Sequence, residues 1–181
     1  MNAEDELRPV PTAPLFSHPE PLPADASASA APMAPARPVE CAVDVPAALD
    51  HAFAGFTEYL HLWWPFEDLS VHGPGSYAGF EEGSLVETSA EGDLTEWADV
   101  TAWEPPTRLG LAWHQGGPAG RSTEVEIRWI PVAAGGTRVE LVQVGWATSE
   151  VDHAERAVYA EFLPRAFARY ARFMGSQGSA Q

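Results

Sequence analysis

The sequence predicts an α+β domain over residues 37–175, in which a curved antiparallel sheet of about seven strands wraps around one long C-terminal helix. Three observations predict this fold. Between residues 76 and 144, short segments of alternating hydrophobicity follow one another, with Gly and Pro turn signals between them. One more alternating segment and two short helical segments come before them. After residue 150, the apolar residues change to helical spacing and keep it to the end of the domain.

The domain is expected to begin with one strand and two short helices. Apolar and polar residues alternate over 39–45, which indicates a half-buried strand. Pro46 ends this strand and is expected to be the first residue of a helix, because proline tolerates that position. Apolar residues at helical spacing over 49–56 continue this helix. A second short helix is expected over 59–64, where Pro65 ends it.

Six further strands form the expected meander. We expect them at 76–81, 84–88, 94–103, 108–114, 122–132 and 136–144. Because the connections are short, neighbouring strands are expected to pair as antiparallel hairpins. A meander of this length must curl, and its apolar face needs a cover. The C-terminal helix is the only segment long enough to supply it, so we expect an enclosed space between sheet and helix.

The C-terminal helix is predicted from a single apolar stripe. Its expected members are Val151, Ala154, Val158, Phe162, Ala166, Tyr170 and Phe173. Pro164 lies inside the helix and is expected to kink it, because its ring clashes with a carbonyl one turn back and it has no N–H donor. Gly175 is placed to cap the end of the helix.

The alternation along three strands predicts which side chains point into the space between sheet and helix. The inward set is Leu109, Leu111, Trp113, Val125, Ile127, Trp129, Val139, Leu141 and Gln143, whereas Glu124, Glu126 and Arg128 point to water. Gln143 is thus an amide in an apolar interior, where an unpaired amide costs about 1–3 kcal/mol. A backbone group or a water could satisfy this amide, or it could orient a polar group of a bound molecule.

Composition bounds the remaining properties. Residues 1–36 are rich in Pro and Ala and are expected to be disordered, with 10–16 either a docking motif or part of a neutral linker; 176–181 are expected to be flexible. The net charge of −16 disfavours nucleic acid and a membrane surface as partners. With no signal peptide or long apolar run and a single cysteine, Cys41, we expect a cytoplasmic protein without disulfides. All ten basic residues are arginine, which indicates a GC-rich bacterial genome.

The stretch from Glu96 to Trp113, which includes Trp97, Trp103-Glu104-Pro105-Pro106 and Arg108-Leu109, resembles a signature of the SRPBCC (START-like) superfamily. It is similar in particular to the activator of heat-shock-protein-90 ATPase. The resemblance covers about residues 38–174 and implies a helix-grip fold, with a hydrophobic cavity between the sheet and the C-terminal helix. It implies little about chemistry, because members of this superfamily include lipid carriers and polyketide cyclases.

The patterns of several catalytic and metal sites are missing from the sequence. Five histidines are scattered along the predicted domain and do not have metal-ligand spacing: His51, His61, His72, His114 and His153. The sequence contains neither a G-x-S-x-G elbow nor a glycine-rich phosphate loop. A single acid or base remains possible: His114 is expected to be solvated at a strand end, and His61 to be partly buried on a helix. We therefore assign no catalytic residue, no metal and no cofactor.

The leading interpretation is a protein that binds a small apolar molecule, aromatic or lipid-like, in the cavity between sheet and helix. The residues expected to line that cavity are Trp63, Trp64, Trp97, Trp113, Trp129, Gln143, Tyr159 and Phe162. Two alternatives stay open: a cyclase-like enzyme that uses one cavity acid or base, and a co-chaperone-like module that binds a protein partner. The protein is expected to be a monomer or a homodimer.

Overall fold

A computed structural model describes residues 36–117, 121–147 and 149–176. The predicted tail (1–36) and the predicted flexible C-terminus (176–181) lie outside these residues, except for Ala36 and Ser176. The statements about the two segments therefore remain predictions.

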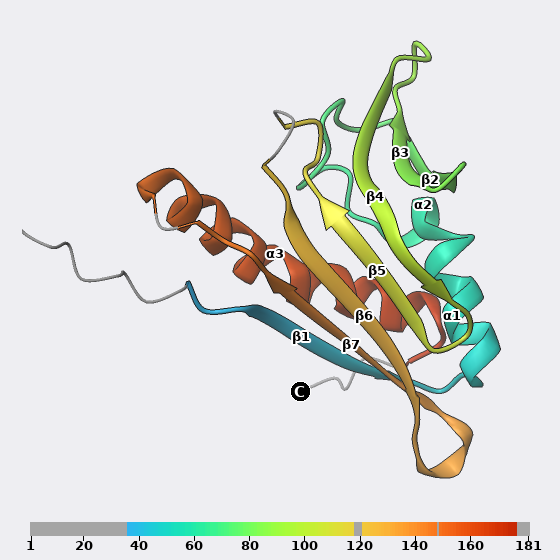
Figure 1. Ribbon diagram of the computed structural model, residues 1–181. Coiled ribbons are helices and arrows are strands. Elements are labelled where there is room, and N and C mark those ends of the chain that lie inside the picture. Colours follow the sequence, from blue (N-terminus) through green and yellow to red (C-terminus); the bar gives the residue numbers. More distant parts are fainter. Residues whose placement is uncertain (1–35, 118–120, 148, 177–181) are drawn as a thin grey trace, which may run out of the picture. The chain divides into compact units, whose positions relative to one another are not determined.

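The strands form one seven-stranded antiparallel sheet, in the order β1-β7-β6-β5-β4-β3-β2 (Figure 1). Their bounds are β1 (Val39–Val45), β2 (Tyr77–Glu81), β3 (Ser84–Thr88), β4 (Leu94–Glu104), β5 (Arg108–Trp113), β6 (Thr123–Pro131) and β7 (Thr137–Val144). Strands β2 to β7 are a meander of neighbours, and β1 pairs with β7 at the sheet edge opposite β2. The predicted α+β helix-grip fold is confirmed, with each predicted strand within two residues of its observed bounds.

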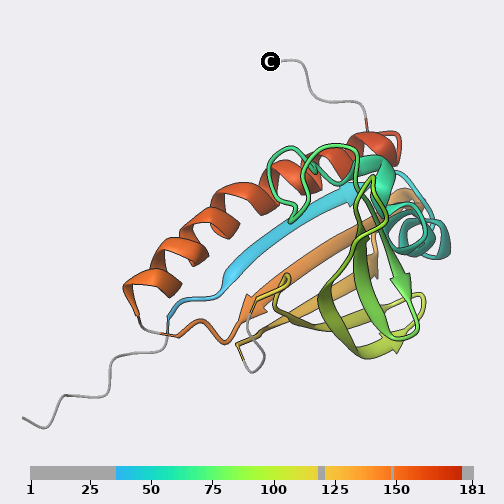
Figure 2. The same ribbon diagram turned by 90° about the horizontal axis from the view of Figure 1, so that it is seen from above.

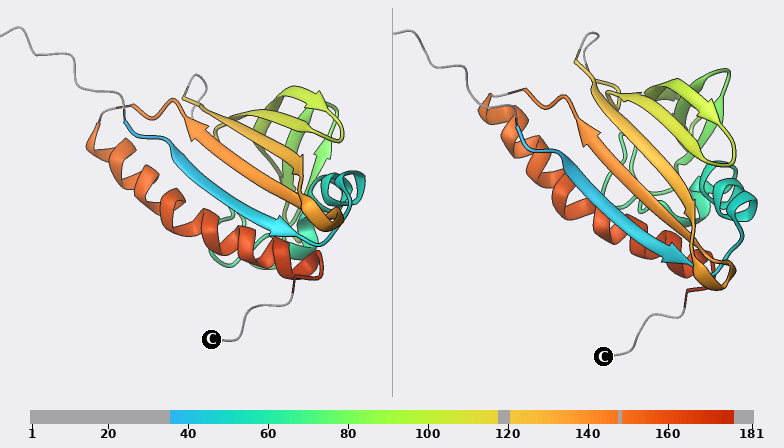
Figure 3. Two further views of the ribbon diagram at one scale, coloured as in Figure 1. Left: turned by 90° about the horizontal axis from the view of Figure 1, so that it is seen from below. Right: turned by 60° about the horizontal axis from the view of Figure 1, so that its bottom comes forward.

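Three helices pack with this sheet. They are α1 (Leu49–Thr57), α2 (Leu60–Trp63) and α3 (Glu150–Phe173), and a 3-10 turn η1 (Ala133–Gly135) joins β6 to β7. Figures 2 and 3 show the sheet curving around α3, which runs along β1, with α1 and α2 beside the last turns of α3. Among the residues that the structure describes, no helix is both long and apolar enough to cross a membrane.

The start of α1 differs from the prediction. The helix begins at Leu49 and not at Pro46, because Ala48 still has extended backbone angles and its carbonyl accepts the first helical hydrogen bond, from the Ala52 N–H. Pro46 and Ala47 form the bend between β1 and α1.

Helix α3 is continuous through Pro164. This proline lies on the exposed face, where water can bond the carbonyl that loses its helical donor; the expected kink stays a prediction. Gly175 caps the helix as predicted. It has φ 90°, its N–H donates to the Arg172 carbonyl, and the N–H of Ser176 donates to the Ala171 carbonyl, which is the Schellman pattern.

The predicted stripe of α3 is correct only for its members between residues 162 and 170. Phe162, Ala166 and Tyr170 are buried, whereas Val151 and Val158 are exposed. The other exposed members of the stripe are Ala154 and Phe173. In the first half, the buried residues are Asp152 and Tyr159, both of which hydrogen-bond to side chains outside the helix. The inward face of the first half therefore combines polar contacts with the packing of the Tyr159 ring on Trp113 and Trp146.

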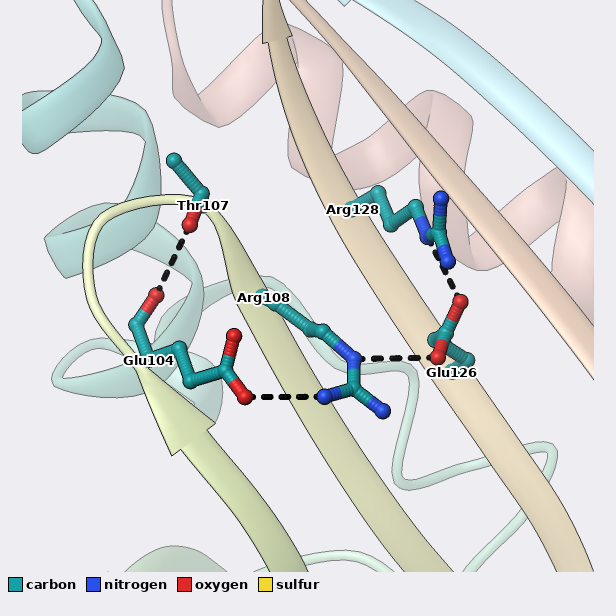
Figure 4. A network of polar contacts seen from close by, with 5 residues as sticks. All are labelled: Glu104, Thr107, Arg108, Glu126 and Arg128. Atoms are coloured by element: carbon teal, nitrogen blue, oxygen red, sulfur yellow. Dashed lines mark hydrogen bonds and ion pairs between the residues drawn. The ribbon is translucent and has the colours of Figure 1, made fainter.

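The outer face of the sheet carries the charged residues that the alternation placed there. Arg108 bridges Glu104 on β4 (2.8 Å) and Glu126 on β6 (3.0 Å), and Arg128 also contacts Glu126 (2.6 Å), as Figure 4 shows. Exposed pairs of this kind contribute about 0–1 kcal/mol each. This network lies on the outer face of the sheet. The cavity described below lies on the opposite face, between the sheet and α3.

Candidate functional site

A small apolar cavity lies between the sheet and α3. Its volume is about 30 Å³. Its walls are formed by Phe56, Leu60, Trp64, Phe80, Leu85, Leu111, Trp113, Val125, Ile127, Leu141, Gln143, Tyr159, Leu163 and Phe167. We call this space the inner cavity. This volume holds about one water. It is too small for an aromatic ring, because a cavity that binds benzene measures about 150 Å³.

Gln143 places a polar group in this apolar wall. The side chain is 2% exposed and points inward with Val139 and Leu141, so the predicted alternation on β7 is confirmed. Its Nε2 donates to the Thr123 hydroxyl at 2.8 Å. This partner is a side chain, and neither a backbone group nor a water. Among the side-chain hydrogen bonds of the described residues, none is accepted by its Oε1, so this acceptor is available to a bound molecule in the wall.

Trp113 and Tyr159 separate the inner cavity from a second space nearer the surface. The Trp113 indole N–H donates to the Tyr159 hydroxyl at 2.7 Å, and that hydroxyl donates to the Gln115 Oε1 at 2.5 Å. Burial raises the pKa of Tyr159 above its usual value, while the hydrogen bond from Trp113 lowers it by less. The tyrosine is thus neutral at physiological pH and is held in place from both sides.

The space beyond this pair is a polar hollow of about 210 Å³, which we call the outer pocket. Its walls are Trp113, His114, Gly117, Arg121, Ser122, Thr123, Gly145, Trp146, Ala147, Asp152, Glu155 and Tyr159. Because Trp113 and Tyr159 line both spaces, a molecule passing from the outer pocket to the inner cavity would have to move them.

Asp152 is the most constrained ionisable group of the outer pocket. It is buried at the start of α3, where the Ser149 hydroxyl donates to its carboxylate and the Asp152 N–H donates back to Ser149 at 3.2 Å. Arg121 forms an ion pair with the same carboxylate. The Ser149 hydrogen bond first, and then Arg121, hold the pKa of Asp152 below its usual range against the effect of burial. Asp152 is therefore a carboxylate anion that is already hydrogen-bonded to Ser149 and ion-paired with Arg121.

The walls of the inner cavity include Trp64, Trp113, Gln143 and Tyr159, four of the eight residues named from the sequence. That they bind a ligand stays a prediction. The other four, Trp63, Trp97, Trp129 and Phe162, are buried in the packed core. Trp63 donates to the Gly55 carbonyl, and Trp129 packs edge-on against Phe53 and Phe56 of α1. Trp97 donates to the Glu87 carboxylate, and Phe162 packs on Trp64. Trp63 and Trp129 thus pack on Phe56 of α1, whereas Trp97 packs on Trp64 and Phe66.

The two histidines considered as acids or bases have different positions. His114 lines the outer pocket, and its Nε2 lies 3.3 Å from the Glu96 Oε1 and 3.9 Å from the Asp99 Oδ2. Ligand atoms of these three side chains lie within 4.8 Å of one another. Glu96 and Asp99 are exposed, and exposed acidic groups are common without an ion, so the cluster alone does not indicate a metal site. His61 stacks on Tyr77 at 4.6 Å and lines neither space.

Sequence reasoning missed Arg121, Asp152 and Gln115, which shape the outer pocket. One signal was present: Ser149 followed three residues later by Asp152 matches the start of a capped helix. The pairing of Asp152 with Arg121 joins residues from two distant segments and leaves no local pattern.

No family model matches the chain, and no curated protein matches it. Similar folds occur among solved structures. The anthrahydroquino-gamma-pyrone synthase Txn09 is 26% identical, over 77% of this chain and 97% of that chain, with a TM-score of 0.53. CalC from Micromonospora echinospora, described as a self-sacrificing resistance protein, is 18% identical, over 80% and 97% of the two chains, with a TM-score of 0.57. DynU16, a putative protein in the dynemicin biosynthetic locus, is 21% identical, over 78% and 48%, with a TM-score of 0.54.

These likenesses concern the fold and cover nearly the whole length of two of the three proteins. They agree with the sheet order, the two short helices after β1 and the long C-terminal helix described above. The finer resemblance to the activator of heat-shock-protein-90 ATPase stays a prediction. The chain has a START-like, helix-grip fold of the SRPBCC type.

Proposed function

We propose that the protein binds a small, largely apolar aromatic molecule in the inner cavity, with a hydroxyl or similar donor of that molecule on the Gln143 Oε1. The free acceptor on Gln143 is the observation that carries this proposal. In an otherwise apolar wall, one uncommitted polar atom selects for a ligand with a matching donor. The other polar atoms of the wall are already bonded: Trp64 donates to the Leu69 carbonyl, and Trp113 donates to Tyr159.

Binding requires the inner cavity to grow, because its present volume of about 30 Å³ does not hold a ring. Trp113 and Tyr159 are the two lining residues of the inner cavity that also border the outer pocket. We infer that a ligand enters from the outer pocket and moves this pair. The solved neighbours support an aromatic ligand, since one of them is a synthase of an anthrahydroquino-gamma-pyrone.

A pair of matched probes tests the proposal. 1-Naphthol carries a hydroxyl and naphthalene does not, so only 1-naphthol can use the Gln143 Oε1. Gln143→Leu should weaken 1-naphthol by about 1–3 kcal/mol, or about 5- to 150-fold in Kd, and leave naphthalene nearly unchanged. The change is measured by quenching of tryptophan fluorescence, with circular dichroism as the check that the variant is folded.

Two outcomes would count against the proposal. Equal affinity of the two probes for the wild-type protein would show that Gln143 does not select a donor. Equal loss of both probes in Gln143→Leu would show that the residue shapes the cavity and does not bond the ligand. Native mass spectrometry of freshly purified protein then identifies the natural ligand class by the mass of any molecule that is released.

A second candidate function is a cyclase-like enzyme, which the ionisable groups of the outer pocket favour. His114 and Glu155 line the route to the inner cavity, and His114 is the one histidine among the described lining residues. A histidine at this position could remove a proton from a bound carbonyl compound. His114→Gln would then abolish the turnover of a β-diketone substrate, followed by mass spectrometry, while its binding is kept. Equal turnover by both proteins would remove this candidate.

The co-chaperone-like alternative rests on the sequence resemblance alone and stays a prediction, as do a cytoplasmic location and the state of monomer or homodimer. A change in the rate of a partner ATPase on addition of the protein would support a protein partner.

A further inference from the structure

A third hollow lies on another part of the surface and is lined by residues of α1, β2 and the end of β4. Figure 1 labels these three elements. Its volume is about 490 Å³. Its walls are Asp50, Phe53, Ala54, Thr57, Glu58, Tyr77, Gly79, Phe80, Glu81, Trp103, Pro105 and Pro106. We call it the α1 groove. It shares Phe80 with the inner cavity and no residue with the outer pocket, so its chemistry can be considered separately.

Aromatic rings form the apolar part of the α1 groove. Trp103 is 45% exposed and is held by edge contacts with Phe53 at 5.5 Å and Phe80 at 5.3 Å. Tyr77 is 44% exposed, and its ring lies so close to Gly79 that a Cβ there would be 3.1 Å from it. The glycine thus lets this ring lie against the strand. Two large aromatic side chains are therefore fixed in place with part of their surface open to the groove.

All the charged side chains that line the α1 groove are acidic. Asp50, Glu58 and Glu81 are exposed, and none of the three forms an ion pair with a residue that the structure describes. No arginine or histidine is among the lining residues within that same part of the chain. By contrast, Glu126 on the outer face of the sheet is ion-paired with Arg108 and Arg128. The groove thus carries unpaired negative charge within a chain of net charge −16.

We propose that the α1 groove binds a small organic cation, a protonated or quaternary amine with an apolar body. A cation is attracted both by the faces of Trp and Tyr rings and by the carboxylates around them. The field of an anionic protein also raises the local concentration of cations. The volume of the groove lies within the range of about 300–1,000 Å³ that is usual for small-ligand sites, which favours a small molecule over a protein segment.

The experiment uses three probes that share one ring: benzyltrimethylammonium, benzyl alcohol and benzoate. The readout is the indole N–H signal of Trp103 in a ¹⁵N-correlation spectrum of the full chain, assigned by its loss in Trp103→Phe. Benzyltrimethylammonium should shift this signal, with a Kd on the order of 1 mM. Benzyl alcohol should bind at least about five-fold more weakly, because it lacks the charge. Benzoate should not bind.

Charge variants show whether binding of the cation depends on the carboxylates of the groove or on the overall negative charge of the protein. Glu81→Gln and Asp50→Asn should each weaken benzyltrimethylammonium by about two- to five-fold, the range for a single exposed charge pair. Glu40→Gln is the matched control, since Glu40 is exposed on β1 at the opposite edge of the sheet and the substitution changes the net charge equally. It should leave the Kd unchanged.

Three results would overturn the proposal: equal binding of benzyl alcohol and the cation, an effect of Glu40→Gln as large as that of Glu81→Gln, or no shift of Trp103 by the cation. Tighter binding of an N-acetylarginine amide than of benzyltrimethylammonium would instead assign the groove to an arginine of a protein partner. The readout does not depend on the inner cavity, so Gln143→Leu should leave the shift of Trp103 intact whether or not that cavity binds a ligand.

Discussion

Replacing Glu87 with glutamine tests how a buried carboxylate holds the segment between α2 and β2 on the sheet. Glu87 lies on β3 and is 0% exposed. Its Oε1 accepts from the Ser70 hydroxyl and from the His72 N–H at 3.1 Å. Its Oε2 accepts from the Val71 N–H and from the Trp97 indole, both at 2.8 Å. One side chain thus bonds three successive residues of the segment and a core tryptophan.

The size of the effect follows from which oxygen the new amide group replaces. In Glu87→Gln the NH₂ group should take the place of Oε1, because the Ser70 hydroxyl can reverse its role and accept a hydrogen bond. The His72 N–H then loses its partner, at a cost of about 1–3 kcal/mol. The bonds from Val71 and Trp97 persist but lose the assistance of the charge. The expected loss in the free energy of unfolding is therefore about 2–4 kcal/mol at pH 7.

The pH dependence of the stability difference between wild type and Glu87→Gln shows whether the variant is weakened by the loss of the negative charge or by the loss of hydrogen-bond geometry. Burial raises the pKa of Glu87, but the hydrogen bonds from Ser70, Val71 and His72 outweigh burial and leave the pKa below its usual value. A carboxylate with a lowered pKa stabilises the fold above its unfolded pKa of about 4.3, and this contribution is lost as the pH falls through the folded pKa. The difference between wild type and Glu87→Gln should therefore shrink below about pH 4.

Urea denaturation at a series of pH values from 7 downwards measures this difference, with Glu40→Gln as an exposed control that should change stability by less than about 0.5 kcal/mol. A loss below about 1 kcal/mol at pH 7 would show that Glu87 does not hold the segment. A loss that stays constant at every pH would show that the charge of Glu87 contributes nothing.

Four further results are expected. Phe162→Ala should lower the free energy of unfolding in urea by about 3–5 kcal/mol, because the ring is 1% exposed and its loss leaves a void; a loss under about 1 kcal/mol would contradict this packing. Burial raises the pKa of Cys41 to about 12, so a disulfide reagent at pH 8 should react slowly with native protein and quickly in urea. Burial also raises the pKa of Tyr159 and Tyr170, so stability should fall as the pH rises above their unfolded value of about 10, and absorbance at alkaline pH should show two tyrosines that ionise only on unfolding. Deleting residues 1–36 should move the thermal midpoint by less than about 5 °C, since that segment lacks apolar periodicity.

The sequence predicted the sheet well because most of its strands keep a strict period of two. On β5 and β6, Trp113 and Ile127 are buried as the alternation requires. On β4 the alternation fails, since the register shifts once against β3 and once against β5 and leaves Trp97 and its neighbour Ala98 both buried. Such bulges depend on pairing with other strands and have no signature in the strand itself, so alternation could not place Trp97.

The site was harder to predict than the fold because its polar contacts join distant segments. Gln143 could be predicted, since a glutamine within an alternating apolar strand stands out. Its partner Thr123 lies twenty residues earlier on the neighbouring strand, and nothing in the sequence marks the pair. The burial of Glu87 could not be predicted either. It results from the contacts of its carboxylate with the segment at 70–72, which is distant in the sequence.

The closed state of the inner cavity limits the ligands that can open it. Moving Tyr159 breaks its hydrogen bonds to Trp113 and Gln115, at a net cost of about 1 kcal/mol each. A single aromatic ring that buries about 150–250 Å² gains about 4–6 kcal/mol at 25 cal/mol per Å². Because association itself costs about 4 kcal/mol or more, one ring gains too little to bind tightly. Under the proposed function, the ligand therefore has several rings, and its buried surface continues from the inner cavity into the outer pocket.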